Sequence, residues 1–140
     1  MAEIEGDTKL FDGLSRQGWI GVAFWMSFGL LIEGLIGFRS PSYLSDPVRR
    51  ELFRLAHTHG TVLSILLLIV FVYLAKNFIA RPVAAIWSLR IGTVLMPVGF
   101  LLGGIWHYES DPGVMIFIAP VGGLMVIFGV IAIAVSTFRK

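Results

Sequence analysis

The sequence predicts an all-α integral membrane protein, a transmembrane bundle of four helices in up-down-up-down order. The chain has 140 residues, of which 56% are hydrophobic and only 14% are charged, and its mean hydropathy is +0.85. A soluble domain cannot bury so much apolar surface. The apolar residues also form four runs, each long enough to cross a hydrocarbon core of about 30 Å. We expect a single four-span domain over residues 1–140.

The first span is expected at about 18–38. The polar segment before it, residues 1–17, is expected to form a loose tail or a short helix on the membrane surface. Three apolar residues of this segment would rest on that surface: Leu10, Phe11 and Leu14. Glu33 lies about one helical turn before the end of the span, and we expect its side chain to point into the bundle.

The second helix is expected at about 47–75, with an amphipathic, arginine-rich start. Asp46 can cap the free N–H groups at its beginning, and Pro47 fits the first helical position. A helix of this length spans about 43 Å, so its arginine-rich end stands out of the hydrocarbon core. His57 and His59 then lie where the helix enters lipid, and polar side chains are costly there unless they are paired or functional.

The third span is expected at about 83–106 and the fourth at about 113–138. Arg90, two turns into the third span, is expected to snorkel toward the membrane face that carries both termini. That face holds six other lysines and arginines against four on the opposite face: Lys9, Arg16, Lys76, Arg81, Arg139 and Lys140 against Arg39, Arg49, Arg50 and Arg54. Because basic residues favour the cytoplasmic side, we expect both termini in the cytoplasm of a bacterial inner membrane.

The composition excludes several kinds of cofactor site and covalent cross-link. The chain has no cysteine, which excludes disulfides, thiolate metal sites, iron–sulfur clusters and covalent haem attachment. No nucleic-acid footprint is present, and the motifs of common hydrolases and nucleotide-binding enzymes are missing. Whether the chain is an enzyme therefore stays open. A bundle of 140 residues exposes much surface to the lipid bilayer. We therefore expect a homo-oligomer or a subunit of a larger membrane complex.

The polar residues of the spans converge on one membrane face, opposite the termini. In an antiparallel bundle, the end of the first span, the start of the second and the end of the third share this face. They bring there all three histidines and the one carboxylate that lies well inside a span, and the third loop adds two acidic residues: Glu33, His57, His59, His107, Glu109 and Asp111. We expect these side chains to form one polar layer.

Haem b is the first chemistry that fits this layer. His57 and His59 differ by two positions, about 200° around a helix, so they do not point at one small ion. Either imidazole could be an axial haem ligand. Arg50 and Arg54 lie one to two turns above His57 and could hold the haem propionates.

Two other chemistries and one structural alternative remain. A copper or zinc ion could be bound by Glu33, His107 and Glu109 together with one of the paired histidines. Glu33 and a histidine could instead form a short proton relay. Under the structural alternative, the same groups only lock helices or hold a partner subunit, and the protein has no cofactor.

The run Arg54-Leu55-Ala56-His57-Thr58-His59-Gly60 leads into an apolar helix. It resembles the R-x-x-H-x-H start of a helix in small four-span relatives of the haem–copper oxidase catalytic subunit. The resemblance covers about 20 of the 140 residues and implies that His57 or His59 ligates a haem. No second histidine-rich helix supplies a copper site. We therefore expect a small haem- or metal-binding redox or accessory subunit that serves electron transport.

Overall fold

The computed structural model describes residues 2–77, 82–109 and 111–138, with side chains over 10–76, 82–109 and 111–138. Within these ranges the chain forms α-helices and one 3₁₀ helix, η1: α1 (Ala2–Gly37), α2 (Pro41–Leu44), α3 (Pro47–Asn77), α4 (Val83–Ile105), η1 (Val114–Phe117) and α5 (Ile118–Phe138). Four described segments are long and apolar enough to cross a membrane: Leu10–Gly37, Pro47–Lys76, Val83–Ile105 and Val114–Phe138. The prediction of an all-α, four-span bundle is confirmed.

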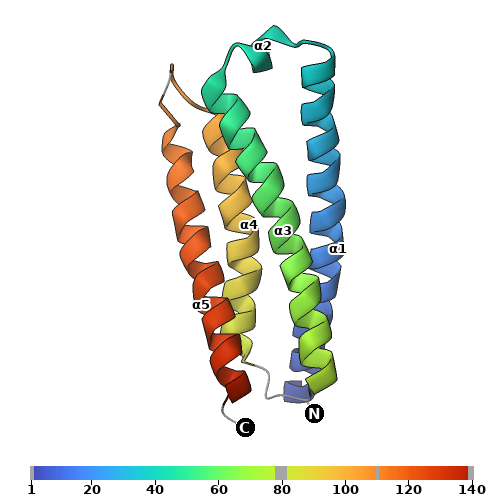
Figure 1. Cartoon of the computed structure of the whole chain (residues 1–140). Helices are drawn as coiled ribbons and strands as arrows, with labels where there is room; N and C mark the ends of the chain where they lie inside the picture. Colours follow the sequence, from blue (N-terminus) through green and yellow to red (C-terminus); the bar gives the residue numbers. More distant parts are fainter. Residues whose placement is uncertain (1, 78–81, 110, 139–140) are drawn as a thin grey trace.

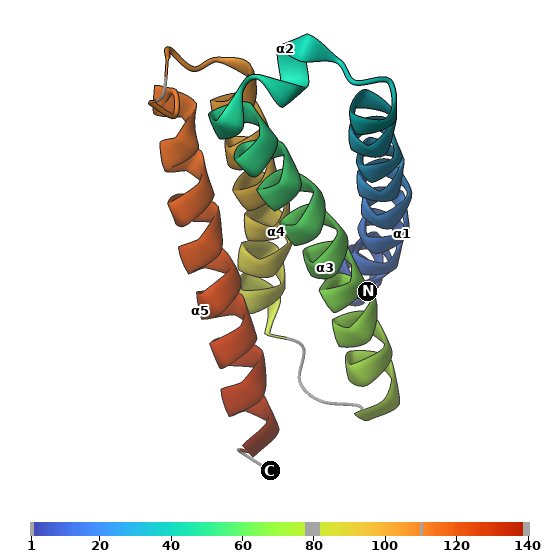
Figure 2. The same ribbon diagram turned by 45° about the horizontal axis from the view of Figure 1, so that its top comes forward.

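The long helices alternate in direction, with both termini at one end and α2 bridging the other end (Figure 1). Helix α1 packs on α3, α3 on α4, and α4 on α5, whereas α1 meets α4 over a small area. Among the described residues, α5 touches neither α1 nor α3. The four helices therefore form an open row rather than a closed square (Figure 2). In the described part of the chain, α5 is therefore held by α4 and η1.

Helix α1 begins at Ala2, so the expectation of a loose tail or separate surface helix over residues 1–17 is wrong. Leu10, Phe11 and Leu14 are buried in the main core instead of resting on the membrane surface. These side chains recur on one face of a helix, and that face docks on α3. The ring of Phe11, for example, lies 4.6 Å from that of Phe71 between their centroids.

Helix α3 begins where the sequence predicts. The backbone N–H of Arg49 donates a hydrogen bond of 2.9 Å to Asp46 Oδ1, which is the expected cap, and Pro47 is the first helical residue. The helix continues to Asn77, two residues past its expected end, and most of the expected connection to the third span lies outside the described residues.

Glycines bring α4 and α5 into backbone contact. A Cβ atom at Gly99 would collide with the backbone of Ala119, and one at Gly122 would collide with the backbone nitrogen of Met96. A Cβ at Gly92 would lie 2.6 Å from the carbonyl oxygen of Gly122. Small residues serve the same purpose in many membrane helix pairs, where packing replaces the hydrophobic effect.

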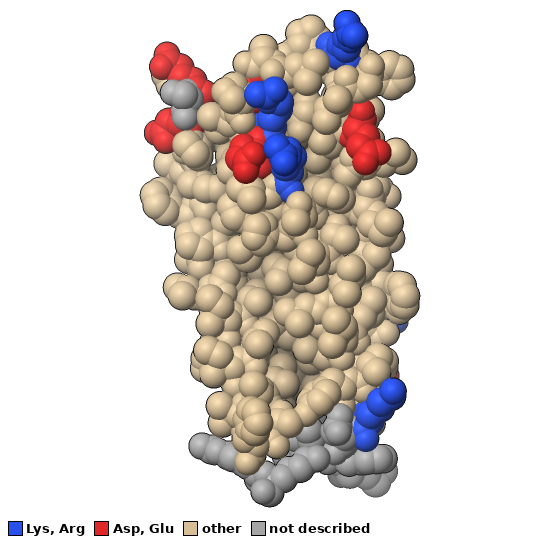
Figure 3. Space-filling model, viewed as in Figure 1, with Lys and Arg blue, Asp and Glu red and all other residues tan. Residues whose placement is uncertain are grey.

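Charged side chains gather near the two ends of the molecule and leave an apolar band between them (Figure 3). Large apolar side chains on the outer faces of α1 and α5 are exposed, for example Phe24, Leu30, Leu124 and Ile131. Exposed apolar surface on this scale requires lipid rather than water around it. The chain is an integral membrane protein.

Candidate functional site

The residues of the predicted polar layer lie at different depths along the bundle. The end of α1, the start of α3 and the end of α4 lie at the same end of the bundle, as expected (Figure 1). His107, however, contacts Asp46 at the very start of α3. His57 follows Asp46 by 11 positions (57 − 46), or about 16 Å along a helix. The three histidines therefore do not share one layer, because α3 runs deep into the bundle between them.

His57 ties α3 to α1. Its Nδ1–H donates a hydrogen bond of 2.8 Å to the carbonyl oxygen of Trp25. Its ring lies directly on Gly29, where any Cβ atom would collide with the imidazole. Glycine at position 29 leaves the space for this ring.

His59 faces a different helix. Its Nδ1–H donates a hydrogen bond of 2.9 Å to the carbonyl oxygen of Leu55, within α3 itself. Its ring centroid lies 5.0 Å from that of Phe100 on α4. The prediction that His57 and His59 point in different directions is confirmed. Over the described part of the chain, no hydrogen bond reaches Nε2 of either ring.

His107 belongs to a contact that joins the end of α4 to the start of α3. Its Nε2 lies 2.8 Å from Asp46 Oδ2, and its side chain is only 6% exposed. Arg49 stands 3.6 Å from the same carboxylate and donates hydrogen bonds to the carbonyl oxygens of Gly104 and Ser42 at 3.2 and 2.9 Å. We call Asp46, Arg49 and His107 the Asp46 latch.

The latch lowers the pKa of Asp46. Burial by itself raises this pKa, but the hydrogen bond from the Arg49 N–H and the charges of His107 and Arg49 outweigh burial and bring it below its ordinary value. A carboxyl group whose folded-state pKa is depressed stabilises the fold above its unfolded pKa of about 3.9. This stabilisation is lost as the pH falls through the folded-state pKa.

Replacing Asp46 by asparagine tests the charge of this side chain separately from its role as the cap of α3. Asparagine caps a helix as well as aspartate does, so Asp46→Asn keeps the cap but removes the charge beside His107. We expect Asp46→Asn to lower the free energy of unfolding in detergent at neutral pH by about 1–3 kcal/mol, which lowers the melting temperature. The difference in stability between pH 7 and pH 3 should also become smaller. Asp46→Ala should lose about 1 kcal/mol more, because it also removes the cap. An unchanged pH dependence in Asp46→Asn would show that the latch contributes nothing.

Glu33 does not point into the bundle, contrary to the prediction, and is exposed on α1. The inward face of α1 carries Trp25, Gly29 and Ile32, all buried. Glu33 follows Ile32 and is turned about 100° away from that face.

The structure does not assemble the predicted ion site of Glu33, His107 and Glu109. Glu109 is exposed in the turn after α4, where its φ is 51°, and His107 is paired with Asp46. Over the described ranges, no three histidine, aspartate or glutamate side chains are grouped to hold a metal ion.

The two arginines proposed for the haem propionates are exposed near the start of α3. Arg54 is 71% exposed, 3.7 Å from Glu51, and Arg50 is also exposed. A pair so open to solvent contributes little to stability, so both side chains are free to reorient.

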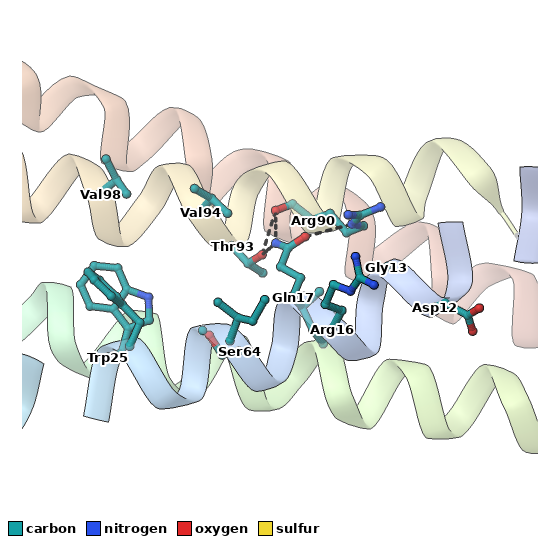
Figure 4. A pocket seen from close by; sticks show the side chains of 14 residues that line it. Asp12, Gly13, Arg16, Gln17, Trp25, Ser64, Arg90, Thr93, Val94 and Val98 are labelled. Atoms are coloured by element: carbon teal, nitrogen blue, oxygen red, sulfur yellow. Dashed lines mark hydrogen bonds between the residues drawn. The ribbon is translucent and has the colours of Figure 1, made fainter. Parts of the chain in front are cut away.

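A second polar cluster, which the sequence analysis missed, lies in the half of the bundle nearer the termini. Gln17 on α1 donates hydrogen bonds to the carbonyl oxygen of Arg90 (2.8 Å) and to Thr93 Oγ1 (3.1 Å). Its own Oε1 accepts a hydrogen bond of 2.9 Å from Arg90 Nε. This Gln17 bridge borders a cavity of about 740 Å³ between α1, α3 and α4 (Figure 4). The sequence pointed to this cluster only through Arg90, a basic residue inside the third span, and Gln17, an amide at the same depth on the first helix.

The fold and these contacts define the class of the protein: a four-span helical membrane protein with one polar region near each membrane face. No family model, curated protein or solved structure matches the chain.

Proposed function

We propose that this chain is a small membrane redox or accessory subunit that carries haem b, with His59 as an axial ligand. One observation carries the proposal: Nδ1 of His59 is fixed on a backbone carbonyl, and Nε2 makes no hydrogen bond within the described residues. Imidazoles that ligate metals are held in this way, with the proton on Nδ1 and the lone pair on Nε2. His59 is partly exposed and its Nε2 is not sealed inside the bundle, so a ligand can reach it.

The contacts favour His59 over His57 as the ligand. His57 holds α1 against α3 and is pressed on Gly29, so its ring already has a packing role. The hydrogen bond of His59 stays inside α3, and its ring contacts α4 at Phe100 without a hydrogen bond. Phe100 lies beside it and supplies an apolar wall of the kind that surrounds a haem edge.

The groups around His59 fit a haem that other chains also help to bind. Arg50 and Arg54 are exposed toward the membrane surface but lie on the His57 side of α3, so the propionates of a haem on His59 would need basic groups of another chain. The flat outer faces of α1 and α5 are apolar, and a second copy or a partner subunit could cover the haem. We therefore propose that the protein works in a homo-oligomer or a larger electron-transport complex. The excess of basic residues at the terminal end supports a bacterial inner membrane with cytoplasmic termini.

A pair of histidine variants tests this function. His59→Ala should abolish the Soret absorption per mole of protein while the helical circular dichroism stays that of the wild type. His57→Ala, the matched control two positions away, should keep the haem and melt at a lower temperature, because it loses the bond to Trp25. Equal haem content in the two variants would contradict the assignment. Elemental analysis of the same samples distinguishes haem iron from a copper or zinc ion.

A structural accessory subunit without a cofactor is the second candidate. The Asp46 latch and the bond between His57 and Trp25 favour it, since both are contacts between helices. Under this function the wild type is colourless and free of stoichiometric metal, and His59→Ala changes nothing but packing against Phe100.

A further inference from the structure

The cavity between α1, α3 and α4 has two chemically different ends. It exists because α1 and α4 approach each other over a small area, near the Gln17 bridge, while α3 forms the floor. One end, toward the chain termini, carries Arg16 and Arg90, and the other end is closed by Trp25 (Figure 4). The groove faces the space that lipid occupies around the bundle, because Ile20 and Phe24 on its rim are more than half exposed.

The terminal end of the groove is positively charged. Arg90 uses Nε for the bond to Gln17 and stacks over the Trp87 ring at 4.8 Å, which leaves its terminal nitrogens beside Gly13. Arg16 is exposed and lines the same end. Within the described residues, neither guanidinium group has a carboxylate within 4 Å, although Asp12 lines the cavity. Among the described side chains that line this end, two cations and one carboxylate give a net charge of +1.

Gly13 makes this arrangement possible. A Cβ atom at position 13 would lie 2.8 Å from Arg90 Nη1. The glycine therefore leaves room for the Arg90 guanidinium against α1, at the end of the groove that Arg16 also lines. Five N–H groups in a planar fork are suited to phosphate, and only one of those on Arg90 has a partner among the described residues.

Beyond the Gln17 bridge the groove is mostly apolar, with Ser64 as its polar lining residue there. Apolar side chains of all three helices line this part: Ile20 and Phe24 of α1, Leu67 of α3, and Val94 and Val98 of α4. The distance along α1 from Gln17 to Trp25 is about 12 Å at 1.5 Å per residue. A basic site at membrane-surface depth thus continues into a trough long enough for the first part of an acyl chain.

We propose that this groove binds an anionic phospholipid, with the phosphate on Arg16 and Arg90 and one acyl chain along the α1–α4 trough up to Trp25. Charge complementarity selects the occupant: the groove is cationic at its mouth and apolar along its length. Basic pockets between membrane helices recognise anionic headgroups in this way. The site is separate from His59 and does not depend on the proposed haem.

Two variants address the two ends of the groove. Arg16→Gln removes a charge that has no described partner, so the fold should be kept. Val94→Trp fills the trough from a position that is already 47% exposed. Their controls are Arg54→Gln, an exposed arginine at the opposite membrane face, and Val62→Trp, a 58% exposed valine on α3. The readout is native mass spectrometry of full-length protein in detergent with added phosphatidylglycerol, phosphatidylcholine or inorganic phosphate.

The wild type should retain phosphatidylglycerol in preference to phosphatidylcholine. Arg16→Gln should lower that retention about fivefold, the effect of about 1 kcal/mol for one basic residue, and Val94→Trp should abolish it. Both controls should match the wild type. Equal retention of the two lipids, or equal losses in variants and controls, would overturn the proposal. Retention of inorganic phosphate with no lipid preference would assign the arginines to a soluble anion and overturn it as well.

Discussion

Gly122→Leu is expected to release α5 from the rest of the bundle. At this position any Cβ atom meets the backbone nitrogen of Met96, which cannot move aside as a flexible side chain can. Overpacking of a core costs about 1–3 kcal/mol when side chains can adjust, and more when backbone must separate. Helix α5 rests on α4 and η1 alone, so no other described contact would hold it. The measurement is the melting temperature in detergent together with protease sensitivity of the α5 segment.

Gly123→Leu is the matched control for this substitution. It adds the same side chain at the next residue, where a Cβ would lie 3.7 Å from Met96 Sδ, an ordinary contact. We expect Gly123→Leu to melt like the wild type and to resist protease. Equal behaviour of the two variants would show that close approach at Gly122 does not hold α5.

Gln17→Leu is expected to open the contact between α1 and α4. The substitution removes the acceptor for Arg90 Nε and the donor to Thr93 Oγ1. A buried polar group that loses its partner costs about 1–3 kcal/mol, and more when the group is charged. The charge of Arg90, inside a span, is then left without its described hydrogen bond. We expect a clear loss of thermal stability, measured by circular dichroism in detergent.

Ser27→Ala controls for loss of a side-chain hydrogen bond on the same helix. Ser27 Oγ donates to the carbonyl oxygen of Ala23 within α1, and its side chain is exposed. Its removal should change the melting temperature little. A Gln17→Leu protein as stable as Ser27→Ala would mean that the bridge does not hold α1 against α4.

Much of the fold could be predicted because lipid imposes strong constraints on sequence. Runs of apolar residues have to match the bilayer thickness, and Asp46 and Pro47 carry a local start for α3. The start of α1 could not be predicted in this way. Leu10 and Leu14 lie in a polar segment, and their burial depends on α3 and α4, which lie far away in the sequence.

The geometry of the candidate residues could be predicted only in part. Helical periodicity alone placed His57 and His59 on different sides of α3, since 200° separates them. The same reasoning failed for Glu33, because the inward face of α1 is decided by the partner helix and runs through Trp25 and Ile32. The pairing of His107 with Asp46 joins two helix ends and has no local sequence pattern.

The groove was not predicted because it depends on three helices at once. The sequence places Gln17 in the segment before the first span and predicts that Arg90 snorkels to the membrane face. Only the continuation of α1 to Ala2 brings Gln17 and Gly13 to the depth of Arg90. The hydrogen bond of Arg90 to another helix therefore could not be predicted from the order of residues along the chain.

Haem binding by His59 is tested by an absorption spectrum of the purified protein, first oxidised and then reduced with dithionite. Haem b bound to His59 predicts a Soret band in the oxidised protein and sharp α and β bands after reduction. The bands should be lost in His59→Ala and kept in His57→Ala. A colourless wild-type protein, purified gently from membranes supplied with haem, would contradict haem binding by this chain and favour the structural accessory subunit.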